Sequence, residues 1–151
     1  MRKDNRNKDN HKGDLRDTGM SLKHDRKWSY ELDRIEEQAK DRNAENIGLQ
    51  FPQGLKRKST DVAADLRQKM PDKVFYISGQ PCYGACDIDK DLFQFVDILV
   101  HFGHSPMQQS PKIVYVPLFS NVDVRPTIDR SLKEIDKSKS VCLVTTAQHM
   151  N

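Results

Sequence analysis

The sequence predicts an α/β fold, in which a parallel sheet of about four strands carries helices on both faces. Apolar runs that continue along their whole length predict the strands, at residues 46–51, 73–78, 96–102 and 112–119. Segments with helical spacing of apolar residues separate them. Strands that are apolar throughout are buried on both faces, which is typical of parallel sheets covered by helices.

The first helix is predicted over residues 29–45, "SYELDRIEEQAKDRNAE". Ser29 is a suitable capping residue, and one face of the helix gathers Leu32, Ile35 and Ala39. The run "NIGLQF" follows as a strand that ends at Pro52. Trp28 and Tyr30 are expected to anchor this helix.

A second helix is predicted over residues 52–70, where apolar residues recur at helical spacing and Pro71 closes the segment. The strand at 73–78 comes next, and the stretch "PCYGACD" (81–87) follows it. A short helix over 87–95 leads to the strand at 96–102.

Beyond the fourth strand, a helix is predicted over 127–138 and a further strand over 140–146, "SVCLVTT". Five strands exceed what a compact four-stranded unit needs, so this last strand is expected to open a second domain. Residues 28–138 then form the first α/β domain and 139–151 the truncated start of the next. Cys142, inside the apolar run, is expected to be a core residue.

Residues 1–27 contain nine Lys or Arg, five Asp or Glu and almost no large apolar side chain. Such a segment cannot bury enough surface to order itself, so a disordered charged tail is predicted. The other residues carry 16 basic and 17 acidic groups, so the tail accounts for the net charge of +3. We therefore expect no direct nucleic-acid binding. Without an apolar run of membrane-spanning length or a signal peptide, we also expect no membrane association and a cytoplasmic location with reduced thiols.

The two cysteines of "PCYGAC", Cys82 and Cys86, leave several interpretations open. Their spacing differs from the usual CxxC redox pair. They could join His101 and His104 in a zinc site, or ligate an iron–sulfur cluster next to glycine, whose backbone amides can donate to cluster sulfides. They could also be small buried apolar residues. Pro81 and Gly84 shape a turn, which favours a site.

Three unusual turns follow the first three strands: "FPQGL", "SGQPCYGAC" and "HFGHSP". Because parallel strands end at the same edge of a sheet, the three turns are expected on one rim, where ligands of such sheets gather. The free amides near Gly54 could receive a carboxylate or another anion. Gln53, Gly54 and His104 are therefore candidate ligand-binding residues, and no catalytic residue is assigned.

The segments "GLQFPQGL", "ISGQPCYGACD", "DILVHFGHSP" and "LVTTAQH" resemble, in order and approximate spacing, the archaeal diphthamide synthesis enzymes. These are 2-(3-amino-3-carboxypropyl)histidine synthases. The resemblance runs from about Asn46 to His149. It implies three similar α/β domains, each giving one cysteine to a 4Fe–4S cluster whose open iron binds S-adenosylmethionine.

By this resemblance, reductive cleavage of S-adenosylmethionine yields a 3-amino-3-carboxypropyl radical, which adds to a histidine of translation elongation factor 2. That reaction is the first step of diphthamide biosynthesis. The cysteine of "YGAC", Cys86, is the implied cluster ligand in preference to Cys82. An electron donor and a homodimer are also implied.

The chain stops at Asn151, before the family's other cluster cysteines are expected. This predicts an incomplete synthase: a truncated product, a fragment, or half of a split enzyme with a companion chain that supplies the missing domains. The alternatives are a non-catalytic partner subunit of a split synthase, or a small zinc-binding α/β module that uses Cys82, Cys86, His101 and His104.

Overall fold

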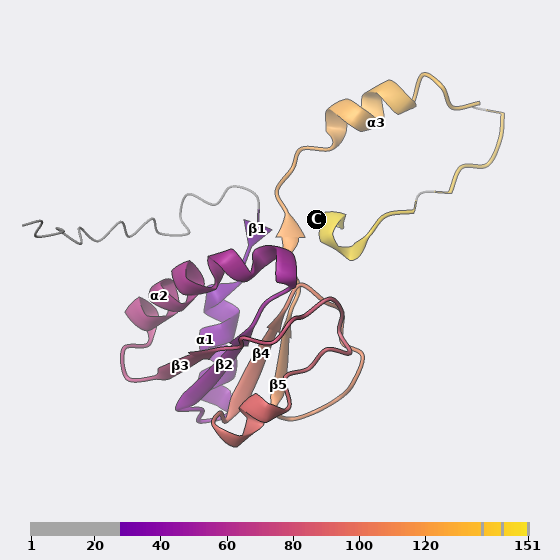
Figure 1. The fold of residues 1–151 in the computed structure, drawn as a ribbon. Coiled ribbons are helices and arrows are strands. Elements are labelled where there is room, and N and C mark those ends of the chain that lie inside the picture. Colours follow the sequence, from indigo (N-terminus) through magenta and orange to yellow (C-terminus); the bar gives the residue numbers. More distant parts are fainter. Residues whose placement is uncertain (1–27, 137, 143, 151) are drawn as a thin grey trace, which may run out of the picture.

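A computed structural model describes residues 28–136, 138–142 and 144–150 of the chain (Figure 1). Its centre is a four-stranded sheet of order β3-β2-β4-β5 in which every neighbouring pair is parallel. The strands are β2 (Asn46–Gln50), β3 (Val74–Ile77), β4 (Ile98–Phe102) and β5 (Ile113–Val116). The predicted α/β fold with a four-stranded parallel sheet is confirmed. The tail predicted over 1–27 lies outside the described residues.

The strand order places a topological switch point between β2 and β4. From β2 the chain crosses to β3 on one side and then returns to β4 on the other. The register aligns Gln50 at the end of β2 with His101 of β4. In parallel α/β sheets, the crevice at the carboxyl ends of the strands beside such a point is where ligands bind.

One face of the sheet packs against both long helices, α1 (Leu32–Asp41) and α2 (Ser59–Lys69). Ile35 of α1 and Leu66 of α2 belong to the same buried cluster as alternate residues of the central strands, such as Ile47 and Val100. Period-two alternation sends these strand residues to one face of the sheet. The helices therefore form with this cluster the main hydrophobic core of the domain.

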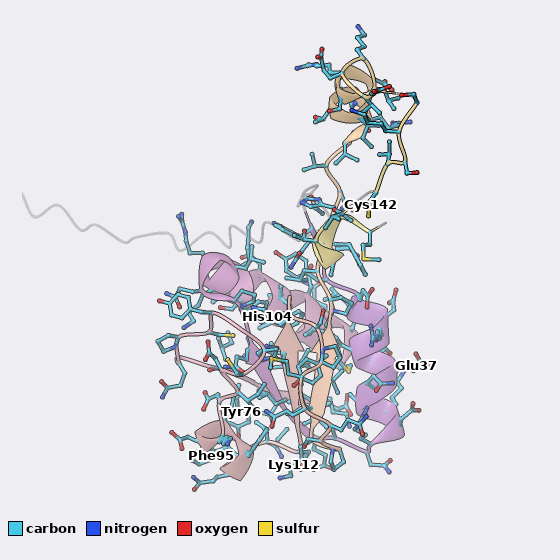
Figure 2. All side chains as sticks on the ribbon, turned by 90° about the vertical axis from the view of Figure 1, so that its right-hand side faces the viewer. Glu37, Tyr76, Phe95, His104, Lys112 and Cys142 are labelled. Carbon is cyan, nitrogen blue, oxygen red and sulfur yellow. The ribbon has the colours of Figure 1, made fainter. Side chains whose placement is uncertain are left out.

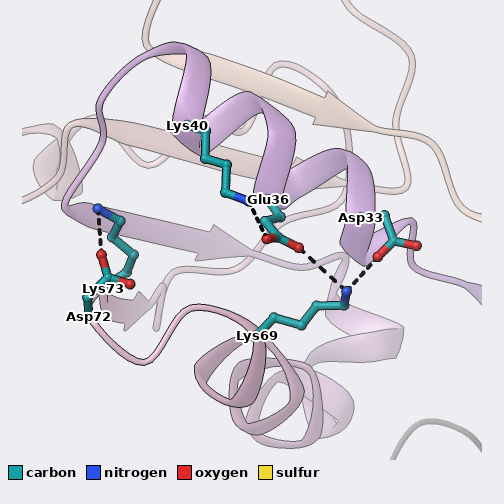
Figure 3. Close-up of polar contacts among 6 residues, drawn as sticks. All are labelled: Asp33, Glu36, Lys40, Lys69, Asp72 and Lys73. Carbon is teal, nitrogen blue, oxygen red and sulfur yellow. Dashed lines mark hydrogen bonds and ion pairs between the residues drawn. The ribbon is translucent and has the colours of Figure 1, made fainter.

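Ion pairs also join α1 to α2 at the surface (Figure 3). The Lys69 ammonium of α2 lies between the carboxylates of Asp33 and Glu36 on α1, and Lys40 bonds to Glu36 one turn along that helix. Solvent-exposed pairs of this kind stabilise a fold only weakly. The buried cluster beneath them holds the two helices together.

The segment before α2 is a 3-10 helix, η2 (Gln53–Lys58), so the helix predicted over 52–70 is in fact two elements. Its first turn closes through the Leu55 N–H, which donates to the Pro52 carbonyl at 2.8 Å. Proline has no N–H to donate and presets its own φ, which suits a tight entry turn.

The second face of the sheet is covered by the cysteine turn and the 3-10 helix η3 (Asp91–Gln94), where an α-helix over 87–95 was predicted. Asp89 accepts a hydrogen bond from the Leu92 N–H at 3.2 Å, and such local bonds compete with helix formation. Gly48 of β2 permits the close approach: a Cβ there would meet Leu99 Cδ1 at 2.8 Å and Leu92 Cδ2 at 3.0 Å.

A short antiparallel ladder, which the sequence did not predict, joins the two ends of the domain. Strand β1 (Trp28–Ser29) pairs with β6 (Phe119–Ser120). Trp28 also packs against the main core, and Tyr30 is buried in it. The expected anchoring of the first helix by these two aromatic residues agrees with this packing.

After β6 the chain leaves the sheet, and the described part contains α3 (Arg125–Ser131) and η4 (Ala147–His149) (Figure 1). No strand is present at 140–142 or 144–146, and Cys142 is exposed, so the expectation of a buried Cys142 is wrong. Val141 and Val144 are 62% and 86% exposed. An apolar run becomes a strand only where a neighbouring strand pairs with it, and the described residues provide none here. The proposed domain division at 139 remains a prediction.

None of the helices in the described part of the chain combines the length and the apolar character needed to cross a membrane.

Candidate metal centre

The three predicted turns meet at the carboxyl ends of β2 and β4. The Gln53 N–H of the first turn donates to the Cys82 carbonyl of the second at 2.8 Å. Cys82 Sγ lies 3.9 Å from His104 Nδ1, in the third turn. Figure 2 shows His104 at this end of the strands, opposite Phe95 and Lys112. The rim inferred from the order of the turns is thus present in the structure.

Gln50 is a fully buried polar residue at the end of β2, and its partners fix the orientation of its amide. Its side-chain NH2 donates to the Asp87 carbonyl, and its oxygen accepts from the Asp89 N–H at 3.3 Å. The same oxygen lies 3.0 Å from His101 Nδ1. Because a carbonyl oxygen only accepts, we assign the ring proton of His101 to Nδ1.

His101 and His104 form the next link of this chain of hydrogen bonds. His101 Nε2 lies 2.9 Å from His104 Nδ1. With its proton on Nδ1, a neutral His101 accepts at Nε2, so His104 Nδ1–H is the donor. A polar chain therefore runs from the sheet interior at Gln50, through His101, to the half-buried ring of His104.

Both imidazoles are held in the neutral form at neutral pH. The pKa of His101 is lowered from 6.5 to about 4, chiefly by burial and then by the neighbouring His104, while Asp87 acts in the opposite direction. Burial also lowers the pKa of His104, against the raising effects of Asp87 and the backbone of Tyr83. Neutral imidazole is the form that binds metals.

Gly103 turns the chain back so that His104 reaches His101. Its φ is +79°, and a Cβ at this position would meet Pro52 Cγ at 2.7 Å. Both the left-handed backbone and the contact exclude an ordinary side chain. The glycine of "HFGHSP" thus brings together two histidines that are three residues apart.

Asp87 organises the cysteine turn. Its Oδ2 accepts hydrogen bonds from the N–H groups of Tyr83 and Gly84, at 2.7 and 3.0 Å. These bonds, led by that of Tyr83, lower the pKa of the Asp87 carboxyl. The Gly84 amide, which the sequence analysis considered as a donor to cluster sulfides, is therefore engaged by Asp87 in this structure.

The two cysteines of the turn differ in their surroundings. Cys82 is fully buried, and burial, followed by the charge of Asp87, raises the pKa of its thiol. Cys86 is exposed, and its Sγ lies 3.6 Å from Asp87 Oδ1. An exposed thiol can ligate a group too large for the interior, whereas the Cys82 thiol reaches only atoms inside the fold.

Among the described residues, the ligand atoms of Cys82, His101 and His104 all lie within 4.8 Å of one another. Cys86 does not belong to this group, so the structure brings together three of the four residues of the zinc site considered from the sequence. The choice of Cys86 as the cluster ligand remains a prediction that its exposure fits.

The other candidate ligand-binding residues line the edge of the site. Gln53 and Gly54 are exposed at the start of η2, and the Gln53 N–H is already bonded to Cys82. Beyond the cysteine turn, an open pocket of about 370 Å³ is lined partly by acidic residues, including Asp87, Asp89 and Asp91. Lys90 also lines the pocket, but the three carboxylates outnumber it, so the lining suits a ligand that carries positive charge.

Gln50, Asp87 and the buried pair of Ser78 and Asp89, which share a 2.6 Å hydrogen bond, were not selected from the sequence. A signal existed for Gln50, because a polar residue within an apolar strand needs buried partners. Another existed for Asp87, because an aspartate after a glycine turn often accepts from local N–H groups.

A known protein family and known proteins match the part of the chain that contains this site. The family model described as "Putative diphthamide synthesis protein" matches residues 51–151. A 2-(3-amino-3-carboxypropyl)histidine synthase of Pyrococcus horikoshii is 31% identical to this chain. The match covers 72% of this chain and 32% of the synthase. A subunit 1 of the same synthase from Caenorhabditis elegans is 34% identical over 68% of this chain and 27% of its own length.

Among solved structures, a crystal structure of Dph2 from Pyrococcus horikoshii with a 4Fe–4S cluster matches with a TM-score of 0.68 at 29% identity. The match covers 81% of this chain and 37% of that one. The chain thus spans about a third of the length of the relatives it matches.

Proposed function

Because this chain belongs to the diphthamide synthesis protein family, we propose that it contributes a cluster-binding domain to a 3-amino-3-carboxypropyl transferase. The substrate is S-adenosylmethionine, and the acceptor is a histidine of translation elongation factor 2. This is the first step of diphthamide biosynthesis. The names of the relatives and the 4Fe–4S cluster in the similar Dph2 structure support the proposal.

The observation that carries the proposal is the exposed Cys86 thiol, at the carboxyl rim of a sheet whose match is a cluster-bearing protein. In our proposal Cys86 gives one thiolate to a 4Fe–4S cluster. The turn that presents it is fixed by Asp87, so the thiol keeps a defined position without being covered. The other cysteine ligands come from further domains of the assembly, in a homodimer or in a companion chain.

When bound, the cluster supplies the electron, drawn from a separate reductant, that cleaves the sulfonium carbon–sulfur bond of S-adenosylmethionine by radical chemistry. The protein's part is to hold the substrate at the rim. The acidic pocket beside the turn supports binding of a sulfonium or ammonium group, and Gln53, Gly54 and His104 are the proposed contacts on the other side. Because its pKa is lowered, His104 is neutral and adds no positive charge there.

A chimera tests this function. Residues 46–150 of this chain replace the matching segment of the Pyrococcus horikoshii synthase, and the purified protein is loaded with iron and sulfide without oxygen. We expect transfer of label from carboxyl-labelled S-adenosylmethionine to elongation factor 2 in the presence of dithionite. Cys86→Ala in the chimera should abolish transfer, whereas Cys142→Ala should leave it unchanged.

A folded chimera, verified by circular dichroism, that transfers label equally with and without Cys86 would contradict the proposal. Loss of transfer in Cys142→Ala would contradict it as well, since that exposed thiol lies in the segment after β6, apart from the labelled His104 in Figure 2.

A further inference from the structure

We propose that Cys82, His101 and His104 form a second metal site, for a single zinc ion, that is separate from the exposed Cys86 thiol. One sulfur and two imidazole nitrogens are a ligand set that zinc favours. The proposal goes beyond the transferase function and does not depend on it, because Cys86 takes no part in this site.

The spacing of the three ligand atoms is close to that of a tetrahedral zinc site. Zinc–nitrogen and zinc–sulfur bonds of ordinary length place two nitrogens about 3.4 Å apart, and a nitrogen about 3.6 Å from a sulfur. Here His101 Nε2 and His104 Nδ1 are 2.9 Å apart, and His104 Nδ1 is 3.9 Å from Cys82 Sγ. Shifts of roughly half an ångström bring these two distances to zinc values, and His101 Nε2 and Cys82 Sγ, which lie within 4.8 Å of each other, must also close to about 3.6 Å.

The hydrogen bonds behind His101 already suit a metal ligand. A histidine that binds zinc usually donates its second ring N–H to an oxygen, which fixes the tautomer and the ring orientation. His101 Nδ1 donates to Gln50, whose amide is itself held by the Asp87 carbonyl and the Asp89 N–H. The lone pair at Nε2 is thereby directed toward His104 and Cys82.

The metal would join two parts of the rim. His101 and His104 belong to β4 and the turn after it, whereas Cys82 opens the cysteine turn. Beside the proposed metal position, these two parts meet through the weak 3.9 Å approach of Cys82 to His104 and through the hydrogen bond of His104 to the Tyr83 backbone. A zinc ion here fixes the turn that carries Cys86 onto the end of the sheet, with a water at the fourth position beside half-buried His104.

Binding of zinc at this site releases protons in a fixed ratio. Zinc replaces the thiol proton of Cys82, so one proton leaves the protein for each ion bound. His104 presents Nδ1 to the metal by moving its ring proton to Nε2, with no net release. No oxidant or reductant is needed.

Cobalt(II) titration of the metal-free full chain, with its cysteines reduced, tests the site. We expect one cobalt ion per chain, a thiolate-to-cobalt charge-transfer band in the near ultraviolet and strong visible bands from tetrahedral coordination. Zinc should displace the cobalt. Cys82→Ser should remove the charge-transfer band, and His104→Gln should weaken cobalt binding at least tenfold while the band persists at saturation.

The matched controls are Cys86→Ser and Cys142→Ser, which should bind cobalt as the wild type does. Circular dichroism of each metal-free variant separates misfolding from ligand loss, and zinc should raise the melting temperature of the wild type but not of Cys82→Ser. Loss of the charge-transfer band in Cys86→Ser would overturn the proposed site. A wild type that binds less than one tetrahedral cobalt ion per chain would overturn it as well. Neither result bears on label transfer by the chimera, which tests Cys86 and the cluster.

Discussion

Gln50 is a buried glutamine at the end of an apolar strand, and its polar atoms bond to His101, Asp87 and Asp89. Each of these partners is itself part of the rim. The side chain therefore connects the interior of the sheet to the cysteine turn, and its removal leaves buried polar groups without partners.

We predict that Gln50→Leu lowers the free energy of unfolding by about 2 to 4 kcal/mol. The substitution leaves His101 Nδ1–H, the Asp87 carbonyl and the Asp89 N–H without their hydrogen-bond partner. Urea unfolding measures the change. Gln53→Leu, at an exposed position, is the matched control and should stay within about 0.5 kcal/mol of the wild type. Equal stabilities of the two variants would contradict the structural role of Gln50.

His101 gives the stability of the domain a defined pH dependence. Its folded pKa of about 4 lies below its ordinary value of 6.5, so the unfolded chain binds this proton first as the pH falls. The contribution is complete above pH 6.5 and is lost between 6.5 and 4. It amounts to at most about 3 kcal/mol. The free energy of unfolding, measured between pH 4 and 6.5, should change less steeply with pH in His101→Gln than in the wild type. An identical pH dependence in the two proteins would contradict a buried neutral histidine.

At the scale of single elements, the turn after β4 depends on Gly103. Gly103→Ala should cost about 1 to 2 kcal/mol, because an alanine at φ +79° is strained and its Cβ meets Pro52. Gly54→Ala is the matched control, since its Cβ meets no atom within 4 Å. Thermal unfolding compares the two variants. If Gly103→Ala were as stable as Gly54→Ala, the turn would not depend on the glycine.

The elements that the sequence predicted correctly are those with a strong local pattern. The four strands come from short, mostly apolar runs, and the amphipathic α1 has a helical period that specifies its buried face. The errors lie where other contacts override the apolar pattern. In the 87–95 segment, Asp89 accepts a local hydrogen bond from the Leu92 N–H, and a 3-10 turn forms in place of an α-helix. The apolar 140–146 run has no strand beside it among the described residues.

The candidate site also has features that the sequence predicts and features that only the fold shows. The shared rim was predictable, because parallel strands end together, and Cys82, His101 and His104 do meet there. The separation of the two cysteines was not predictable. Only the fold shows that Cys82 is buried beside His104 while Cys86, four residues later, is exposed beside Asp87.

At the scale of the whole molecule, the chain has the family's α/β sheet but matches only about a third of the length of its relatives. In our account it contributes one rim, with Cys86 for a 4Fe–4S cluster and a separate inner set of ligands. In our proposal, the other cluster ligands of the transferase come from further domains of the assembly.

Anaerobic reconstitution of the full chain with iron, sulfide and excess dithiothreitol shows whether Cys86 ligates the cluster. Added thiols can occupy the cluster positions that, in our proposal, other domains fill. Absorption and iron analysis should show a 4Fe–4S cluster in the wild type, Cys82→Ala and Cys142→Ala, and none in Cys86→Ala. A cluster that survives in Cys86→Ala and is lost in Cys82→Ala would contradict the account.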